Sequence, residues 1–239
     1  DIIERTLIIG GQNSAFYFID GFTKDEIILK LMDSFLNISA DDMPEDATSF
    51  STSCIPYVEV DILGDFDSIF KNLLSGVTCL FIDGYEAAIA IDCRTYPSRS
   101  IEEPDKDKSL RGSRDGFVET IVFNTALMRR RIRDPHLIME MYEAGTSTRT
   151  DVALCYMSDR VDRELLTTIQ NKLEESKSQD LKMSQQSLAE ALFQRKWYNH
   201  PKYKFTERPD TACACLMEGK VIILTDTSPS ALIPANLHL

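Results

Sequence analysis

The segment from Arg111 to Gly116 (Arg-Gly-Ser-Arg-Asp-Gly) holds the residues best suited to binding a charged partner. Glycine lets a backbone approach a ligand closely, and a helix that began at Gly116 would present free N–H groups to an anion. The segment lacks the Lys-[Ser/Thr] ending of a nucleotide-binding loop. A helix start capped by Ser113 or Asp115 explains the same residues equally well, so both interpretations stay open.

No combination of nucleophile and base indicates an enzyme. The histidines are His136, which follows a proline, His200, which precedes one, and His238, so all three read as loop or end residues. The sequence has no Gly-x-Ser-x-Gly turn and no glycine-rich phosphate loop. We therefore expect no catalytic residue, and the protein is predicted not to be an enzyme.

The six cysteines do not form a metal-binding or redox pattern. Cys79, Cys93 and Cys155 lie in apolar runs, where a free thiol behaves as a small core residue. Cys213-Ala-Cys215 lacks the two-residue gap of a zinc or redox motif. We expect no metal, no cofactor and no disulfide, and free thiols favour a reducing compartment.

The first half of the chain shows alternating sequence signals of strands and helices. Thr23 with Glu26 three residues later is typical of a capping box, and Asp65 predicts the cap of a helix that Gly76 ends. Asp83-Gly84 between two apolar runs predicts a hairpin. The expected elements are strands at 7–9, 15–19, 55–63, 77–82 and 87–92, helices after Thr23 and Asp65, and a loop over 39–53.

The second half repeats this mixture of elements. We expect helices over 116–131, 161–173, 184–196 and 210–216, and strands at 138–142, 151–157, 221–224 and 231–233. One four-residue echo, Phe18-Ile-Asp-Gly21 and Phe81-Ile-Asp-Gly84, is too short to establish a repeat, since a strand that ends in Asp-Gly is a common turn. We therefore predict no internal duplication.

Charge divides the chain unevenly. Residues 1–105 hold 20 acidic and 6 basic residues, whereas residues 106–239 hold 18 acidic and 20 basic residues. The acidic part repels phosphate, so no nucleic-acid partner is expected. The prolines and charges of residues 94–114 predict a linker. The prediction is an α/β protein of two subdomains, 1–105 and 106–239, each with a mixed sheet flanked by helices.

Three blocks of sequence carry a resemblance to a known family. The first runs from Asp92 to Asp105, the second from Leu110 to Arg133, and the third comprises Glu207–Ala212 with Met217–Ala231. Together they resemble the A subunits of the GerA type of spore-germination proteins. The blocks span most of residues 80–234, and residues 1–75 match less distinctively.

The resemblance implies the soluble N-terminal portion of a membrane protein of the inner spore membrane, with membrane helices expected beyond residue 239. It also implies a role in germination, coupled to ion and dipicolinate release, and partners among other germination or SpoVA-operon membrane proteins, with a homo-oligomer expected. The alternative is a two-lobe module that closes on a small ligand, like a substrate-binding protein. The expected partner or interlobe residues are Arg111, Gly112, Arg114, Asp115, Gly116, Glu119, Arg208, Pro209 and Asp210.

Overall fold

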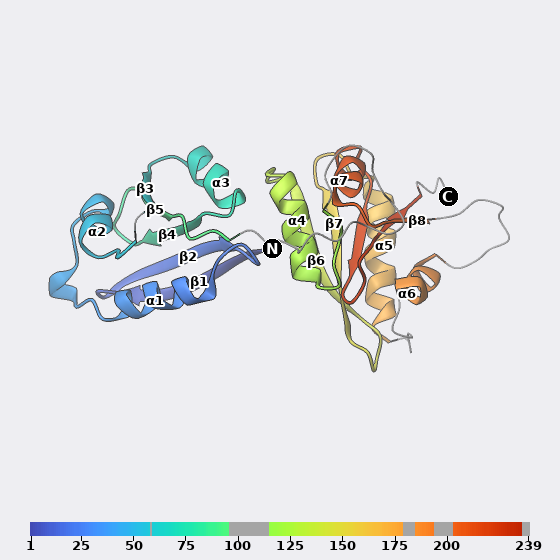
Figure 1. The fold of residues 1–239 in the computed structure, drawn as a ribbon, viewed down its shortest axis with the longest axis horizontal. Coiled ribbons are helices and arrows are strands. Elements are labelled where there is room, and N and C mark those ends of the chain that lie inside the picture. The colour runs from blue at the N-terminus through green and yellow to red at the C-terminus, as the bar shows by residue number, and fades with distance from the viewer. Residues whose placement is uncertain (58, 96–114, 179–184, 194–202, 236–239) are drawn as a thin grey trace. The chain divides into compact units, whose positions relative to one another are not determined.

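Two five-stranded sheets form the framework of the protein (Figure 1). The computed structural model describes residues 1–57, 59–95, 115–178, 185–193 and 203–235. The chain divides into two units, Asp1–Pro97 and Ser98–Leu239, called unit 1 and unit 2 below. The predicted boundary between residues 105 and 106 lies outside the described residues.

Unit 1 has one sheet of strand order β1-β2-β4-β5-β3 with helices on both faces. Phe16, Phe35 and Phe50 belong to the core under α1 and α2, whereas Ile69 and Leu73 of α3 pack on Cys79 on the other face. The strands are β1 (Ile2–Ile9), β2 (Gln12–Ile19), β3 (Val60–Leu63), β4 (Thr78–Ile82) and β5 (Ala88–Ile91). The helices are α1 (Asp25–Leu36), the 3₁₀ turn Ala40–Asp42, α2 (Ala47–Ser53) and α3 (Phe66–Leu74).

Unit 2 has a sheet of strand order β6-β7-β9-β10-β8 between two helix layers. Its two cores contain Leu154 and Leu173 on the α5–α6 side, and Met128 and Leu216 on the α4–α7 side. The strands are β6 (Leu137–Ala144), β7 (Thr150–Met157), β8 (Tyr203–Thr206), β9 (Ile222–Thr225) and β10 (Ala231–Pro234). The helices are α4 (Ile121–Arg131), α5 (Arg163–Ser176), α6 (Gln185–Leu192) and α7 (Pro209–Met217).

The two sheets have the same strand order and the same residue-by-residue register. Leu80 pairs with Ile89 in unit 1 as Ile223 pairs with Leu232 in unit 2. The pairings of all five strands place residues 60–91 on residues 203–234 without a gap. They also place 2–9 on 137–144 and 12–19 on 150–157. The chain is a structural duplication, so our prediction of no internal duplication is wrong.

One equivalent pair of glycines ends the last helix of each unit. Gly76 follows α3 with a φ of +97°, and Gly219 follows α7 with a φ of +84°. A Cβ at Gly76 would lie 2.4 Å from the Phe22 ring, and one at Gly219 would lie 2.6 Å from the Arg160 carbonyl oxygen. Phe22 and Arg160 are themselves equivalent, because each lies three residues after the second strand of its unit.

Most expected elements are present, and the differences have local causes. The α/β class with two sheets flanked by helices is confirmed. Among the described strands, every neighbouring pair is antiparallel, so the sheets are antiparallel rather than mixed. Hairpins supply the pairs β1–β2, β4–β5, β6–β7 and β9–β10. Lys24, not Thr23, precedes α1, and no side chain caps that helix. The expected loop over 39–53 contains α2, which Asp46 caps by accepting from the Ser49 N–H at 2.7 Å. The expected cap at Asp65 is confirmed at 2.8 Å from the Ser68 N–H.

Alanine at the paired glycines tests this account of the fold. Gly84→Ala serves as the control, because Gly84 also has a positive φ (+89°) and a Cβ there would meet nothing within 4 Å. We expect Gly84→Ala to cost about 1–2 kcal/mol from backbone strain alone. Gly76→Ala should cost more, and Gly219→Ala most, because a backbone oxygen cannot swing aside. Urea unfolding followed by circular dichroism measures the order, and equal losses for the three variants would contradict it.

Candidate functional site

The segment that leads into α4 is extended rather than helical. Arg111, Gly112 and Arg114 lie outside the described residues. Asp115 and Gly116 are described, but α4 begins only at Ile121, and its N-cap residue Thr120 makes no side-chain capping bond. Asp115 therefore does not cap this helix. Its carboxylate instead forms an ion pair with Arg131, in the last turn of α4.

Backbone bonds fix this extended segment to unit 2. The Phe117 N–H donates to the Glu207 carbonyl at 2.9 Å, and the Glu119 carbonyl accepts from the Thr227 N–H at 2.6 Å. Asn124, which is fully buried, accepts from the Val118 N–H at 2.8 Å and donates to the Val118 carbonyl at 2.6 Å. Glu119 thus acts here through its backbone, and the segment is anchored at both its ends.

Four charged residues gather where α4 ends and α7 begins. Asp115, Arg131, Arg208 and Asp210 are called the α4–α7 charge cluster. Arg208 Nε donates to Asp210 Oδ1 at 3.0 Å, and the two side chains form an ion pair. Hydrogen bonding from Arg208 lowers the pKa of Asp210, and the charge of Arg131 lowers it further. The structure therefore joins three of the predicted residues, Asp115, Arg208 and Asp210, to Arg131, which was not predicted.

The remaining residues around the cluster have structural positions. Pro209 is the first residue of α7, where a missing N–H costs nothing, and it is buried. Cys213 lies one turn further along α7, and burial raises the pKa of its thiol to about 12. A thiol that stays protonated at neutral pH is a poor nucleophile. All six cysteines are unpaired, and five of them are buried.

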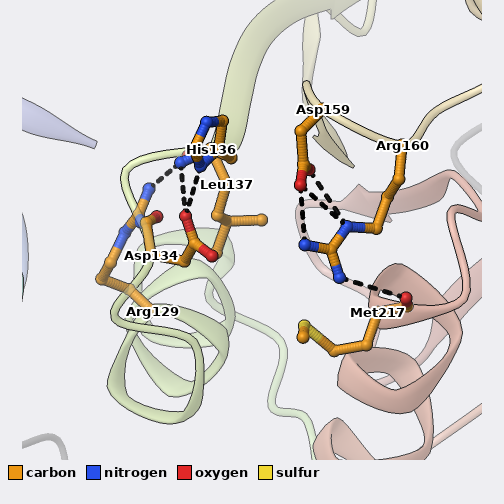
Figure 2. Close-up of polar contacts among 7 residues, drawn as sticks. All are labelled: Arg129, Asp134, His136, Leu137, Asp159, Arg160 and Met217. Carbon is orange, nitrogen blue, oxygen red and sulfur yellow. Dashed lines mark hydrogen bonds and ion pairs between the residues drawn. The ribbon is translucent and has the colours of Figure 1, made fainter.

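A buried arginine forms a second polar centre that the sequence did not reveal. Arg129 is only 2% exposed and donates to the backbone carbonyls of Asp134 at 3.0 Å and Leu137 at 2.7 Å. Figure 2 shows its side chain, which comes from the last turn of α4, beside the turn between α4 and β6. Burial lowers the pKa of Arg129 to about 10, so the side chain is still charged at neutral pH. In the sequence, the arginine-rich run 129–133 is typical of a basic helix end that complements the helix dipole, and nothing in its spacing marks which arginine turns inward.

Charged side chains lie on this turn and on the turn between β7 and α5 (Figure 2). Asp134 Oδ1 accepts from the His136 backbone N–H and faces its ring Nδ1, each at 2.8 Å. Across the turn, Arg160 Nη2 donates to Asp159 Oδ2 at 2.7 Å, and Arg160 Nη1 donates to the Met217 carbonyl at 3.4 Å. Arg160 thus connects the β7–α5 turn to the end of α7. The Ser158 N–H, which donates to the His136 carbonyl at 2.8 Å, connects the β7–α5 turn to the α4–β6 turn.

The carboxylates at this end of unit 2 are not tuned as general acids. A carboxyl group that acts as a general acid near neutral pH needs a raised pKa. Hydrogen bonds instead lower the pKa of Asp134, Asp159 and Asp210. Within the described residues, no three His, Cys, Asp or Glu side chains are grouped as a metal site would require, and no helix is long and apolar enough to span a bilayer. Asp134, Asp159 and Asp210 therefore carry fixed negative charges at neutral pH.

The geometry thus defines a duplicated α/β module with charged contact residues, and comparisons place it in a family. A family model described as "Bacillus/Clostridium GerA spore germination protein" matches residues 1–238. The chain belongs to this GerA family of spore germination proteins. The resemblance indicated by the three sequence blocks is confirmed.

The sequence also indicated a particular relative within the family. Gly112-Ser-Arg-Asp-Gly116, and Ser184–Glu190 before Lys196-Trp197, point to stage V sporulation protein AF. The chain is 34% identical to that protein of Bacillus subtilis (strain 168), over 98% of the chain and 48% of the relative. It is 30% identical to the uncharacterized membrane protein YfkQ of the same organism, over 97% of the chain and 45% of the relative. The chain therefore spans about half the length of these curated relatives.

A solved structure supports the fold. The N-terminal domain of the A subunit of the Bacillus megaterium spore germinant receptor GerK3 matches with a TM-score of 0.71 and 23% identity. The match covers 100% of this chain and 89% of the solved one. At this identity the likeness shows a shared fold.

Truncation of Arg129 tests the buried charge. Arg129→Ala leaves two carbonyls without this donor and removes a packed side chain, so we expect a loss of about 2–4 kcal/mol in the free energy of unfolding. Arg129→Met keeps most of the packing and should lose less. Arg133→Ala, at an exposed position nearby, should change stability by no more than about 0.5 kcal/mol. If Arg129→Ala and Arg133→Ala lowered the free energy of unfolding by the same amount in urea, the buried arginine would not stabilise the fold.

Asp210 gives a pH dependence with a definite sign. Arg208 lowers the pKa of Asp210 in the folded state, so the ionised carboxylate contributes to the free energy of unfolding. This contribution is fully present above the unfolded pKa of about 4 and is lost as pH falls through the lower pKa of the folded state. The side chain is 39% exposed, so we expect Asp210→Asn to cost no more than about 1 kcal/mol at pH 7. Parent and variant should be equally stable near pH 2. A difference that persisted at low pH would show that something other than the ion pair is lost.

Proposed function

We propose that this chain is a non-catalytic assembly module of a spore-germination membrane protein. In this proposal the module contacts neighbouring germination or SpoVA-operon membrane proteins, or further copies of itself, at the inner spore membrane. Those contacts couple it to ion and dipicolinate release through a membrane channel. The observation that carries the proposal is the match to the GerA family across residues 1–238.

The names of the relatives support the membrane setting. One is a stage V sporulation protein, another is called a membrane protein, and the chain spans about half of each. If another part of the whole protein attaches it to the membrane, this α/β part is available to contact neighbouring proteins. We also propose that the part lies on the reducing side, since all six of its thiols are unpaired.

The α4–α7 charge cluster is the surface we assign to partner contact. Asp115 and Asp210 have side chains 34% and 39% exposed, so each can still bind a group from outside while paired with an arginine. Ion pairs at this exposure contribute only about 0–1 kcal/mol to folding, so exchanging partners costs little. Arg111 and Arg114 precede Asp115 in the sequence, and we assign their positive charges to the same partner contact.

Arginine removal in the whole protein tests this assignment. In spores that carry the complete gene, Arg111→Ala with Arg114→Ala should slow dipicolinate release several-fold. The urea unfolding of the isolated chain should change by no more than about 0.5 kcal/mol. The matched control is Lys106→Ala with Lys108→Ala, which removes the same charge from the same stretch of sequence. Parent-like release by the arginine variant, with unchanged stability, would refute the assignment.

A ligand screen separates assembly from the alternative of small-ligand binding. Amino acids, sugars, inosine and calcium dipicolinate are added singly while the melting temperature of the isolated chain is measured. A ligand at 100 times its Kd would stabilise the chain by about 2.7 kcal/mol, which is readily seen. For an assembly module we expect no shift with any of them. A concentration-dependent rise with one compound would favour the two-lobe ligand-binding function instead.

A further inference from the structure

The duplicated units differ by one helix. In unit 2, α4 lies beside α7 and shares a core with the sheet, to which it contributes Ile121 and Met128. Its neighbour Cys213 on α7 lies with Sγ 4.0 Å from the Met128 carbonyl oxygen. In unit 1, α3 occupies the position of α7, but none of the described residues occupies the position of α4.

Residues covered in unit 2 are therefore uncovered in unit 1. Leu137, Cys155, Leu224 and Cys213 share the core with α4 and are all less than 9% exposed. By strand register and helix position, their equivalents in unit 1 are Ile2, Tyr17, Phe81 and Phe70. Ile2 and Phe70 are each 45% exposed, and Tyr17 and Phe81 are half-buried. Phe66 is 72% exposed, whereas its equivalent Pro209 is buried.

These five residues, Ile2, Tyr17, Phe66, Phe70 and Phe81, are called the β1–α3 face. The rings of Tyr17 and Phe81 meet edge to face at 5.5 Å between centroids, and those of Phe66 and Phe70 lie 6.4 Å apart. Aromatic side chains bury large areas, and a cluster of them at the surface marks a site that something covers.

We infer that a helix directly N-terminal to β1 in the same polypeptide covers the β1–α3 face, as α4 covers unit 2. In unit 2 the helix and the first strand are joined by only five residues, Ile132–His136. A short connection makes the preceding segment the occupant with the smallest loop-closure cost. The curated relatives are about twice the length of this chain, so proteins of this family contain further polypeptide that could supply it.

The face also specifies the chemistry of this helix. Apolar residues spaced like Ile121, Thr125 and Met128 would meet the aromatic rings, since positions i, i+4 and i+7 share one side of a helix. Asp67 is the equivalent of Asp210, whose carboxylate is stabilised by Arg131 at the end of α4. We therefore expect a basic residue in the last turn of the covering helix, close to Asp67. Glu4, which replaces the buried Met139, adds a second acid at the same surface.

A comparison of two forms of the protein tests the inference. One form is the 239-residue chain, and the other is a longer form of the same polypeptide that adds about twenty residues ahead of Asp1, enough for a helix of the length of α4 and a short connection. The extension should raise the melting temperature of unit 1 by about 4 °C or more, if it adds at least 1 kcal/mol. It should also slow amide hydrogen exchange in β1 and α3 at least tenfold, with no change in β6 or α7.

A substitution makes the test specific to the face. Phe70→Ser should barely change the melting temperature of the short form, because Phe70 is 45% exposed there, and should abolish most of the gain from the extension. Phe123→Ser is the control, because Phe123 is 43% exposed on α4, outside the β1–α3 face. This substitution should change the melting temperature by the same amount in the short and the extended form. An extension that protects neither β1 nor α3 would overturn the inference. Protection of the short form that grows with protein concentration, with dimers in sedimentation, would overturn it in favour of a second copy.

Discussion

The fold depends on one close approach, repeated in each unit, between the end of the last helix and the turn after the second strand. Gly76 lies against the Phe22 ring and Gly219 against the Arg160 carbonyl oxygen, so neither position has room for a Cβ. A positive φ at each glycine turns the chain from the helix directly into the fourth strand of that unit, β4 or β9. That strand then pairs with the second strand, which gives the order 1-2-4-5-3 in both sheets. In unit 2, α4 and α7 pack on one face of the sheet that this order produces.

The sequence allowed several local features to be predicted at positions where a single residue type decides them, although the expected cap at Thr23 is absent. Asp65 as a helix cap, Gly76 as a helix end and Asp83-Gly84 as a hairpin turn are all present, because each depends on its own backbone preferences. The start of α4 was placed five residues too early, since Asn124 and the strand-like bonds of Phe117 and Glu119 hold that stretch extended. Tertiary bonds of this kind leave no local trace.

The duplication and the charge cluster lay beyond sequence reasoning for a similar reason. Residues 60–91 and 203–234 share only five identical residues, so the amino-acid sequence alone does not reveal the repeat. In the first copy these residues are Asp67, Leu73, Gly76, Asp83 and Ala88. Register preserves the repeat because a slip of one residue would turn every apolar side chain to the wrong face of a strand. The charge cluster combines residues as far apart as Asp115 and Asp210, and only the packing of α4 on α7 brings them together.

The two copies have diverged in how they use charge. Unit 2 buries an arginine, and its α4–α7 cluster pairs two acids with two arginines. Unit 1 retains the equivalent acid, Asp67, and adds Glu4 beside an aromatic surface, within a stretch that holds 20 acids and 6 bases before residue 106. Excess acid around apolar rings disfavours self-association through those rings, because two such faces would repel, and it favours a basic helix as their cover. The same fold therefore supports a charge-balanced surface in one copy and an acidic, aromatic one in the other.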